Sequence, residues 1–164
     1  MFQRVQHFAD LWLIESAATR RVLSRLTDGA LSVRVAPEAR SAGETAWHIA
    51  GAIRDIGAGM ALPLSGPKRG DPVPGEAEEI MAAYARAADE LWRLVTTDWS
   101  DETLREQDDV YGARWERGHT LYILLAHEIH HRGQLTTLLR VAGLTIPWVY
   151  GPSQEVKAPP APPS

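Results

Sequence analysis

The clearest helical pattern in this chain lies in the segment Leu121-Tyr-Ile-Leu-Leu-Ala-His-Glu-Ile-His-His-Arg-Gly-Gln-Leu-Thr-Thr-Leu-Leu139. Its apolar residues recur at the spacing of an amphipathic helix. Within it, His127 and His131 are four residues apart, which is about 400° of helical rotation, so both imidazoles project from nearly the same face. Two such imidazoles supply two ligands to a divalent metal ion and leave positions for another protein ligand and for solvent. The segment therefore predicts a helix that carries part of a metal site.

Three further segments have helical periodicity, and almost nothing in the chain has the pattern of a strand. A capping box at Ser41 and Glu44 marks one helix start, and Gly143 marks one helix end. Between residues 99 and 118 lies a long connection in which a turn or a short ribbon is expected at 110–115. The expected helices run from Val5 to Leu26, from the Ser41 cap to before Pro63, from Glu76 to Thr97 and from Gly118 to Ala142. This pattern predicts an all-α fold, a four-helix bundle with long crossover connections.

The length of 164 residues suits one domain, with 45% hydrophobic and 23% charged residues. We expect residues 1–151 to form this bundle. Residues 152–164 form a Pro-rich tail with too little apolar content to order itself, and we expect it to be disordered.

The net charge of −4 and the scattered basic residues, such as Arg40 and Arg69, argue against nucleic acid or an anionic membrane as a partner. The chain has no cysteine, which excludes disulfides, thiolate metal sites and a cysteine nucleophile. The N-terminus lacks the apolar core of a signal peptide, and no apolar run is long enough to span a bilayer. These features predict a cytoplasmic protein.

A third metal ligand is expected from another helix, and His48, which follows Trp47 on an interior-facing segment, is the candidate. The alternative is that His48 is a hydrogen-bonded core residue. On the last helix, Gln134 returns to the side of His127 and is expected to bond a ligand or a substrate. His130 should lie at the edge of the site or outside it, and Arg132 is expected on the surface, either solvated or paired with an acid.

Several motifs together resemble the DinB/YfiT-like superfamily of metal-dependent bundles. They are Glu44-Thr-Ala-Trp-His-Ile-Ala-Gly51, Trp115-Glu-Arg-Gly118, His127-Glu-Ile-His-His-Arg-Gly-Gln134, Gly143-Leu-Thr-Ile-Pro147 and Tyr150-Gly-Pro-Ser153. The resemblance covers nearly the whole chain. It implies an up-down-down-up bundle, a metal triad of His48, His127 and His131, a zinc or nickel ion and a homodimer. Members with an assigned role include enzymes that use bacillithiol, mycothiol or related small thiols.

Three functions are consistent with these residues. The first is a metal-dependent transferase that joins a low-molecular-weight thiol to a small electrophilic substrate, because a metal with three neutral ligands lowers the pKa of a bound thiol. The second is a hydrolase, since His127 to His131 also satisfies the HExxH pattern with Glu128 as the base. The longer zinc-peptidase pattern fails, however, because Gln134 and Thr137 replace its glycine and its third histidine. The third is a bundle without enzymatic activity, in which the histidines bind metal structurally or not at all.

Overall fold

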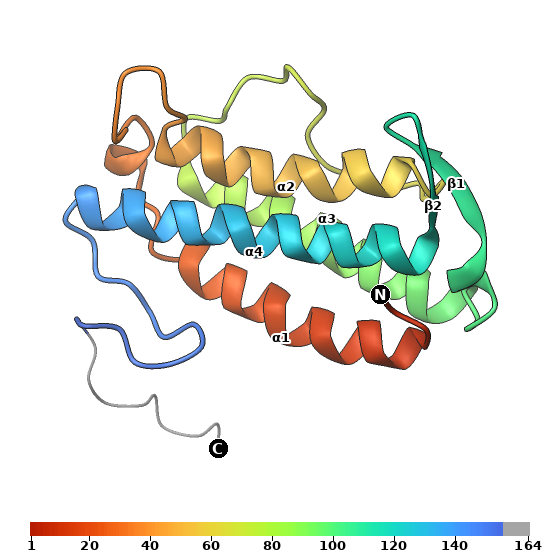
Figure 1. The fold of residues 1–164 in the computed structure, drawn as a ribbon. Coiled ribbons are helices and arrows are strands. Elements are labelled where there is room, and N and C mark those ends of the chain that lie inside the picture. Colours follow the sequence, from red (N-terminus) through yellow and green to blue (C-terminus); the bar gives the residue numbers. More distant parts are fainter. Residues whose placement is uncertain (156–164) are drawn as a thin grey trace.

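The structure is a computed structural model that describes residues 1–155. Four helices form a bundle in which α2 and α3 run opposite to α1 and α4 (Figure 1). Helix α2 packs on α3 and α4, and α1 packs on the same two helices, so α1 and α2 are diagonal partners. The helices are α1 (Val5–Leu23), α2 (Ala42–Ala58), α3 (Ala77–Asp98) and α4 (Arg117–Val141), with 3-10 turns at Asp28–Ala30 and Thr103–Arg105. The predicted four-helix bundle and its up-down-down-up order are confirmed. None of the helices in residues 1–155 combines the length and apolar character needed to cross a membrane.

The expected ribbon between α3 and α4 is a two-stranded hairpin at one end of the bundle (Figure 1). Strand β1 (Gln107–Val110) pairs antiparallel with β2 (Ala113–Glu116). The two turn residues, Tyr111 and Gly112, both have positive φ angles, 55° and 79°. This geometry suits a two-residue hairpin turn, because its twist matches that of the strands.

Helix α2 begins at the predicted capping box. The Ser41 side chain accepts a hydrogen bond from the Glu44 backbone N–H at 3.1 Å, and the Glu44 carboxylate accepts one from the Ser41 N–H at 2.8 Å. The crossover connection (residues 59–76) then returns along the bundle and touches α2 at Gly51. A Cβ atom on Gly51 would lie 3.2 Å from the backbone oxygen of Pro67. Because Gly51 follows His48 by about one helical turn, this contact brings the crossover connection beside His48.

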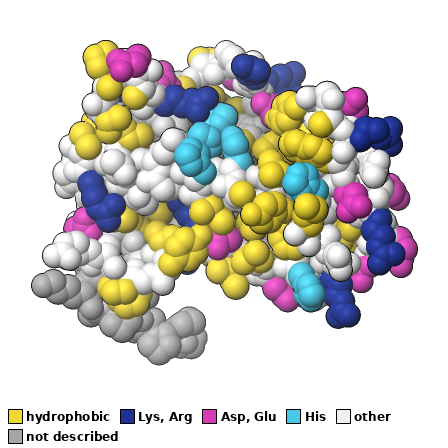
Figure 2. Space-filling model, viewed as in Figure 1, with side chains coloured by type: hydrophobic (Ala, Val, Ile, Leu, Met, Phe, Trp, Pro, Cys, Tyr) yellow, Lys and Arg dark blue, Asp and Glu magenta, His cyan; other side chains and the backbone are white. Residues whose placement is uncertain are grey.

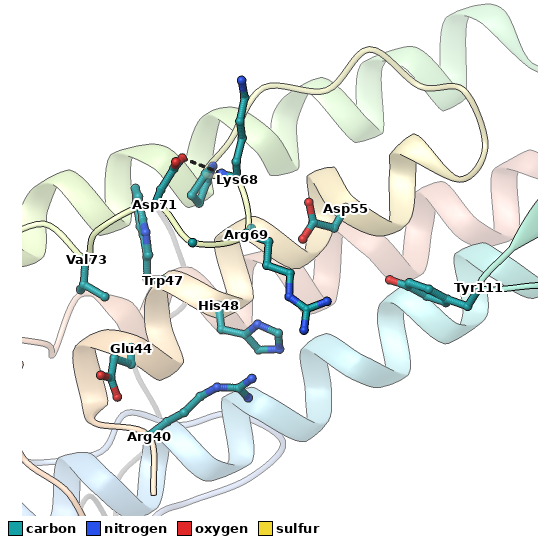
Figure 3. Close-up of a pocket in the computed structure, with 13 residues that line it drawn as sticks. Arg40, Glu44, Trp47, His48, Asp55, Lys68, Arg69, Asp71, Val73 and Tyr111 are labelled. Atoms are coloured by element: carbon teal, nitrogen blue, oxygen red, sulfur yellow. Dashed lines mark hydrogen bonds between the residues drawn. The ribbon is translucent and has the colours of Figure 1, made fainter. Parts of the chain in front are cut away.

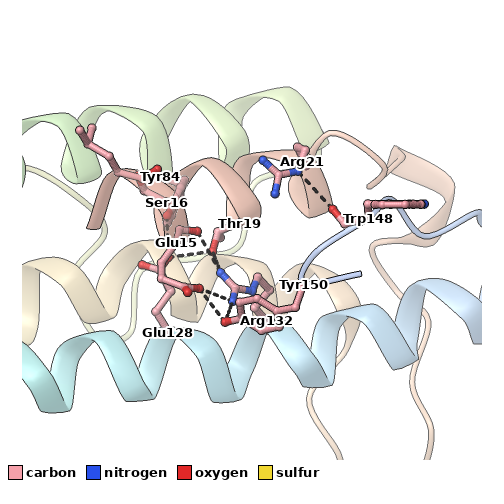
Figure 4. Close-up of polar contacts among 10 residues, drawn as sticks. Glu15, Ser16, Thr19, Arg21, Tyr84, Glu128, Arg132, Trp148 and Tyr150 are labelled. Carbon is pink, nitrogen blue, oxygen red and sulfur yellow. Dashed lines mark hydrogen bonds and ion pairs between the residues drawn. The ribbon is translucent and has the colours of Figure 1, made fainter. Parts of the chain in front are cut away.

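A polar network connects α1, α3, α4 and the C-terminal segment, and it is buried except at Tyr150, which is exposed (Figure 4). It consists of Glu15, Thr19, Tyr84, Glu128, Arg132 and Tyr150. Arg132 pairs with Glu15 at 2.5 Å, and its side chain is 2% exposed. The expectation of a surface Arg132 was therefore wrong, although its pairing with an acid was correct. Burial of this charge is tolerated because the guanidinium also donates to the Glu15 carbonyl, to Thr19 and to the Tyr150 hydroxyl.

After α4, the chain turns at Gly143, whose φ of +75° confirms the predicted helix end. The first residues of the expected tail contact the bundle. Ser153 Oγ donates to the Ile146 carbonyl at 2.9 Å, and Glu155 pairs with Arg140 at 2.8 Å. The rest of the tail, residues 156–164, lies outside the described residues, so the domain limit at residue 151 stays a prediction.

Candidate metal centre

Three histidines from two helices converge at the contact between α2 and α4. His131 Nε2 lies 3.2 Å from His48 Nε2 and 3.1 Å from His127 Nε2. One nitrogen from each ring lies within 4.8 Å of the others. The structure thus brings together the three residues that the sequence selected as metal ligands, which we call the histidine cluster (His48, His127 and His131).

The spacing of these nitrogens fits a small divalent ion. Zinc binds imidazole nitrogen at about 2.0–2.1 Å, so two ligands of a tetrahedral ion are about 3.3 Å apart. The observed separations of 3.1 and 3.2 Å are close to that value. In addition, His127 Nδ1 and the Trp47 indole nitrogen are buried without a hydrogen-bond partner among the described residues. The donor set and these two separations are consistent with a divalent metal ion bound by three protein ligands.

Gln134 selects the tautomer that metal binding requires at one of these ligands. The Gln134 side-chain oxygen lies 2.7 Å from His131 Nδ1 and accepts its hydrogen, which leaves the lone pair on Nε2, inside the cluster. The amide nitrogen of Gln134 donates to His130 Nε2 at 3.0 Å. His130 itself is exposed and lies outside the cluster, in line with the expectation that it sits at the edge of the site or outside it, and its Nε2 accepts the hydrogen bond from Gln134. Gln134 therefore forms the predicted hydrogen bond to a histidine of the cluster.

The surroundings keep the histidine cluster neutral. Partial burial, followed by the positive charge of Arg40, lowers the pKa of His48 to about 4. Burial and the neighbouring His131 lower the pKa of His127 to about 4. Burial also lowers the pKa of His131, against an opposing effect of the bond to Gln134. Neutral imidazoles are the metal-binding form, so the cluster is ready to bind a cation at neutral pH.

A cavity of about 390 Å³ opens beside His48, between α2 and the crossover connection (Figure 3). Its lining includes Arg40, which immediately precedes the α2 cap, together with Arg69 from the crossover connection. Tyr111, from the hairpin turn, lines it as well. The space-filling view shows histidine side chains reaching the surface in this region, next to Lys or Arg side chains (Figure 2). The cluster is therefore reachable by a small molecule.

Glu128 lies on another side of α4, away from the histidine cluster. Its Oε1 accepts hydrogen bonds from Thr19 at 2.7 Å and from Tyr84 at 2.8 Å, and its side chain is buried (Figure 4). Burial raises the pKa of Glu128 to about 6 and that of Tyr84 well above its usual value. A general base has to reach a water molecule at the metal, and Glu128 faces α1 and α3 instead. The geometry therefore removes the role that the HExxH pattern gave to this residue.

The sequence did not single out several residues around the site. Arg40 and Arg69 are 29 positions apart in the chain, so the sequence alone indicates two isolated surface charges. The ion pair of Glu15 with Arg132 and its hydrogen bond with Tyr150 could not be predicted from the sequence either. The sequence does contain one indication of this network. Glu128 and Arg132 are four residues apart, as His127 and His131 are, and each follows one of these histidines directly. This spacing predicts a second face of α4 with its own polar partners.

Comparison with known proteins agrees with this architecture. The chain is 37% identical over 155 residues to the uncharacterized protein YrdA of Bacillus subtilis (strain 168), covering 94% of this chain and 93% of YrdA. It superimposes with a TM-score of 0.88 on the crystal structure of a DinB-like protein from Bacillus cereus ATCC 10987, at 36% identity, covering 92% of this chain and all of that one. The fold is shared with a second DinB-like protein, YjoA of Bacillus subtilis, at a TM-score of 0.70 and 19% identity, over 87% and 96% of the two chains. The profile of the DinB family matches residues 1–162, and the chain therefore belongs to the DinB family.

Proposed function

We propose that this protein is a metal-dependent enzyme that transfers a low-molecular-weight thiol, of the bacillithiol or mycothiol type, to a small electrophile. The convergence of three neutral Nε2 atoms beside an open cavity carries this proposal. The family likeness supports the metal site, and the absence of cysteine from the chain means that the thiol has to come from a second molecule.

Three protein ligands are the number expected of a catalytic site. Within residues 1–155, the cluster contains His48, His127 and His131 and no fourth His, Cys, Asp or Glu. Structural zinc sites are usually closed by four protein ligands, whereas catalytic sites keep a position for solvent or substrate. We propose zinc or nickel as the ion, since both accept imidazole ligands.

A divalent ion held by His48, His127 and His131 would supply a Lewis acid that lowers the pKa of a small thiol. The chain's own residues orient the reactants. Gln134 holds the His131 ring, and the cavity beside His48 receives the substrate. In the transfer, the thiol loses its proton to solvent, its sulfur forms a bond to the electrophilic carbon, and the leaving group departs with the electron pair of the broken bond.

The test is stoichiometric consumption of a small thiol by a model electrophile, such as 1-chloro-2,4-dinitrobenzene, with protein loaded with zinc or nickel. We expect a metal-dependent rate that His48→Ala abolishes. Glu128→Gln serves as the matched control, because Glu128 lies outside the cluster: a thiol transferase should keep its rate, whereas a zincin-type hydrolase should lose it. The absence of a metal-dependent rate with any small thiol, in protein that binds its metal, would contradict the proposal. The homodimer and the small-molecule substrate implied by the resemblance remain predictions.

A further inference from the structure

The charged side chains around the cavity differ in whether they have hydrogen-bond or ion-pair partners. Three acidic side chains line it, and each has a partner. Glu44 pairs with Arg34 at 2.8 Å and caps α2, Asp71 accepts the Lys68 backbone N–H at 2.7 Å, and Asp55 lies 3.4 Å from Arg54. These acids form their hydrogen bonds and ion pairs with neighbours other than Arg40 and Arg69, although the charge of Arg40 also acts on the Glu44 carboxylate.

The two arginines of the cavity have no such partner. Within residues 1–155, neither Arg40 nor Arg69 forms a side-chain hydrogen bond or an ion pair. Figure 3 shows their guanidinium groups on either side of the His48 imidazole, whereas the Lys68 side chain points away from it. Two guanidinium groups that line one cavity and have no hydrogen bond or ion pair among the described residues are suited to bind a carboxylate or a phosphate.

Two further observations favour an anionic ligand at this place. The positive charge of Arg40 acts on all three histidines of the cluster, and Figure 3 shows its guanidinium group beside the His48 imidazole. A divalent ion bound by three neutral ligands would add to this positive charge, and within residues 1–155 no carboxylate belongs to the cluster. Trp47 also lines the cavity, so its indole N–H can report on ligand binding there.

We propose that Arg40 and Arg69 form an anion-binding subsite that holds a carboxylate of the substrate while its reactive end reaches the histidine cluster. The position of the reactive end rests on the proposed function. The subsite itself does not, because neither arginine belongs to the histidine cluster. The carboxylate belongs either to the thiol or to the electrophile, and the experiments below distinguish these two sources.

The first experiment uses the metal-free protein. Succinate and its neutral analogue succinamide are titrated while the indole N–H of Trp47 is followed by NMR. We expect saturable shifts with succinate alone, and about tenfold weaker binding in the double variant Arg40→Ala/Arg69→Ala. The control, Arg25→Ala/Arg105→Ala, removes the same charge from exposed positions that line no described cavity, and should bind succinate like the wild type. Equal binding of succinate and succinamide, or equal binding by the two double variants, would overturn the subsite.

The second experiment uses the metal-loaded protein and matched reactants. Two thiols, 3-mercaptopropionate and 3-mercapto-1-propanol, are each reacted with a neutral electrophile and compared with one another. Two electrophiles, iodoacetate and iodoacetamide, are compared in the same way in their reaction with the neutral thiol. We expect the arginine double variant to raise KM about tenfold for the carboxylate reactant of one pair, with kcat retained. The pair that responds identifies the source of the carboxylate. A transfer rate that is absent while succinate binding still depends on the arginines would refute the thiol transfer and leave the subsite intact.

Discussion

Gln134 Oε1 accepts the Nδ1 hydrogen of His131 at 2.7 Å, and this bond fixes which nitrogen of His131 faces the two other histidines. The Nε2 lone pair of His131 is thereby directed between the two other rings. The His131 Nε2 atom lies 3.2 Å from His48 Nε2 and 3.1 Å from His127 Nε2. A partner behind a ligand histidine sets its tautomer and ring orientation. The candidate metal site therefore depends on Gln134, a residue outside the histidine cluster.

Replacing Gln134 by Leu should weaken metal binding without abolishing it. The Leu side chain cannot accept the Nδ1 hydrogen, so His131 is free to adopt the wrong tautomer or to rotate. The expected loss is about 10–100-fold in affinity, measured by competition with a chromogenic chelator. His130→Ala removes the other partner of Gln134 and should have a much smaller effect. Unchanged affinity in Gln134→Leu would mean that packing alone orients His131.

Removing either Glu15 or Arg132 alone should destabilise the fold, whereas replacing both with apolar residues should be tolerated. Arg132→Met leaves the Glu15 carboxylate buried without its cation, and we expect the free energy of unfolding to fall by about 3–5 kcal/mol. The double variant Glu15→Leu/Arg132→Met removes both charges and should recover much of that loss. Urea denaturation measures both. If the single variant loses less than about 1 kcal/mol, the carboxylate is satisfied by Tyr150 and solvent instead.

Much of this arrangement could be predicted from local sequence rules. The capping box at Ser41, the helix end at Gly143 and the four helices follow from side-chain spacing and backbone conformation, which are properties of neighbouring residues. The facing of His127 and His131 follows from helical geometry in the same way. Arg40, Arg69 and the burial of Arg132 could not be predicted. They depend on which helices become neighbours and on where a long connection returns, and both are decided by tertiary packing.

The stability of the metal-free protein should rise between about pH 4 and pH 6.5. His48 and His127 have folded-state pKa values of about 4, below the usual value of about 6.5 in an unfolded chain. In this window the unfolded chain binds more protons than the folded protein, so acidification favours unfolding. Glu128, whose pKa is raised to about 6, opposes this trend, because the folded protein binds its proton more tightly than the unfolded chain does. This contribution is the same in the wild type and in the histidine variant used for the test. Urea midpoints across the window should therefore rise less steeply with pH in His48→Ala/His127→Ala than in the wild type. An identical slope would show that the two imidazoles are not protected from protonation.

Two glycines of α4 should respond to alanine in opposite directions. A Cβ atom on Gly118 would lie 2.1 Å from the Phe2 carbonyl oxygen, so Gly118→Ala has to displace the N-terminal segment, at a cost of about 1–3 kcal/mol. A Cβ atom on Gly133 meets nothing within 4 Å, and Gly133→Ala should stabilise the helix by up to about 1 kcal/mol. Urea denaturation of both variants measures the difference. A destabilised Gly133→Ala would indicate that this exposed face of α4 is covered in solution.

The most direct test of the metal centre is elemental analysis of untagged protein, as purified and after removal and re-addition of zinc or nickel. The wild type should hold about one equivalent of metal, as expected for a single three-ligand site. His48→Ala and His131→Ala should each lose it, while His130→Ala, at an exposed position outside the cluster, should retain it. Full occupancy in His48→Ala, or no metal in the wild type even after zinc or nickel is added, would contradict an interhelical site built from the histidine cluster.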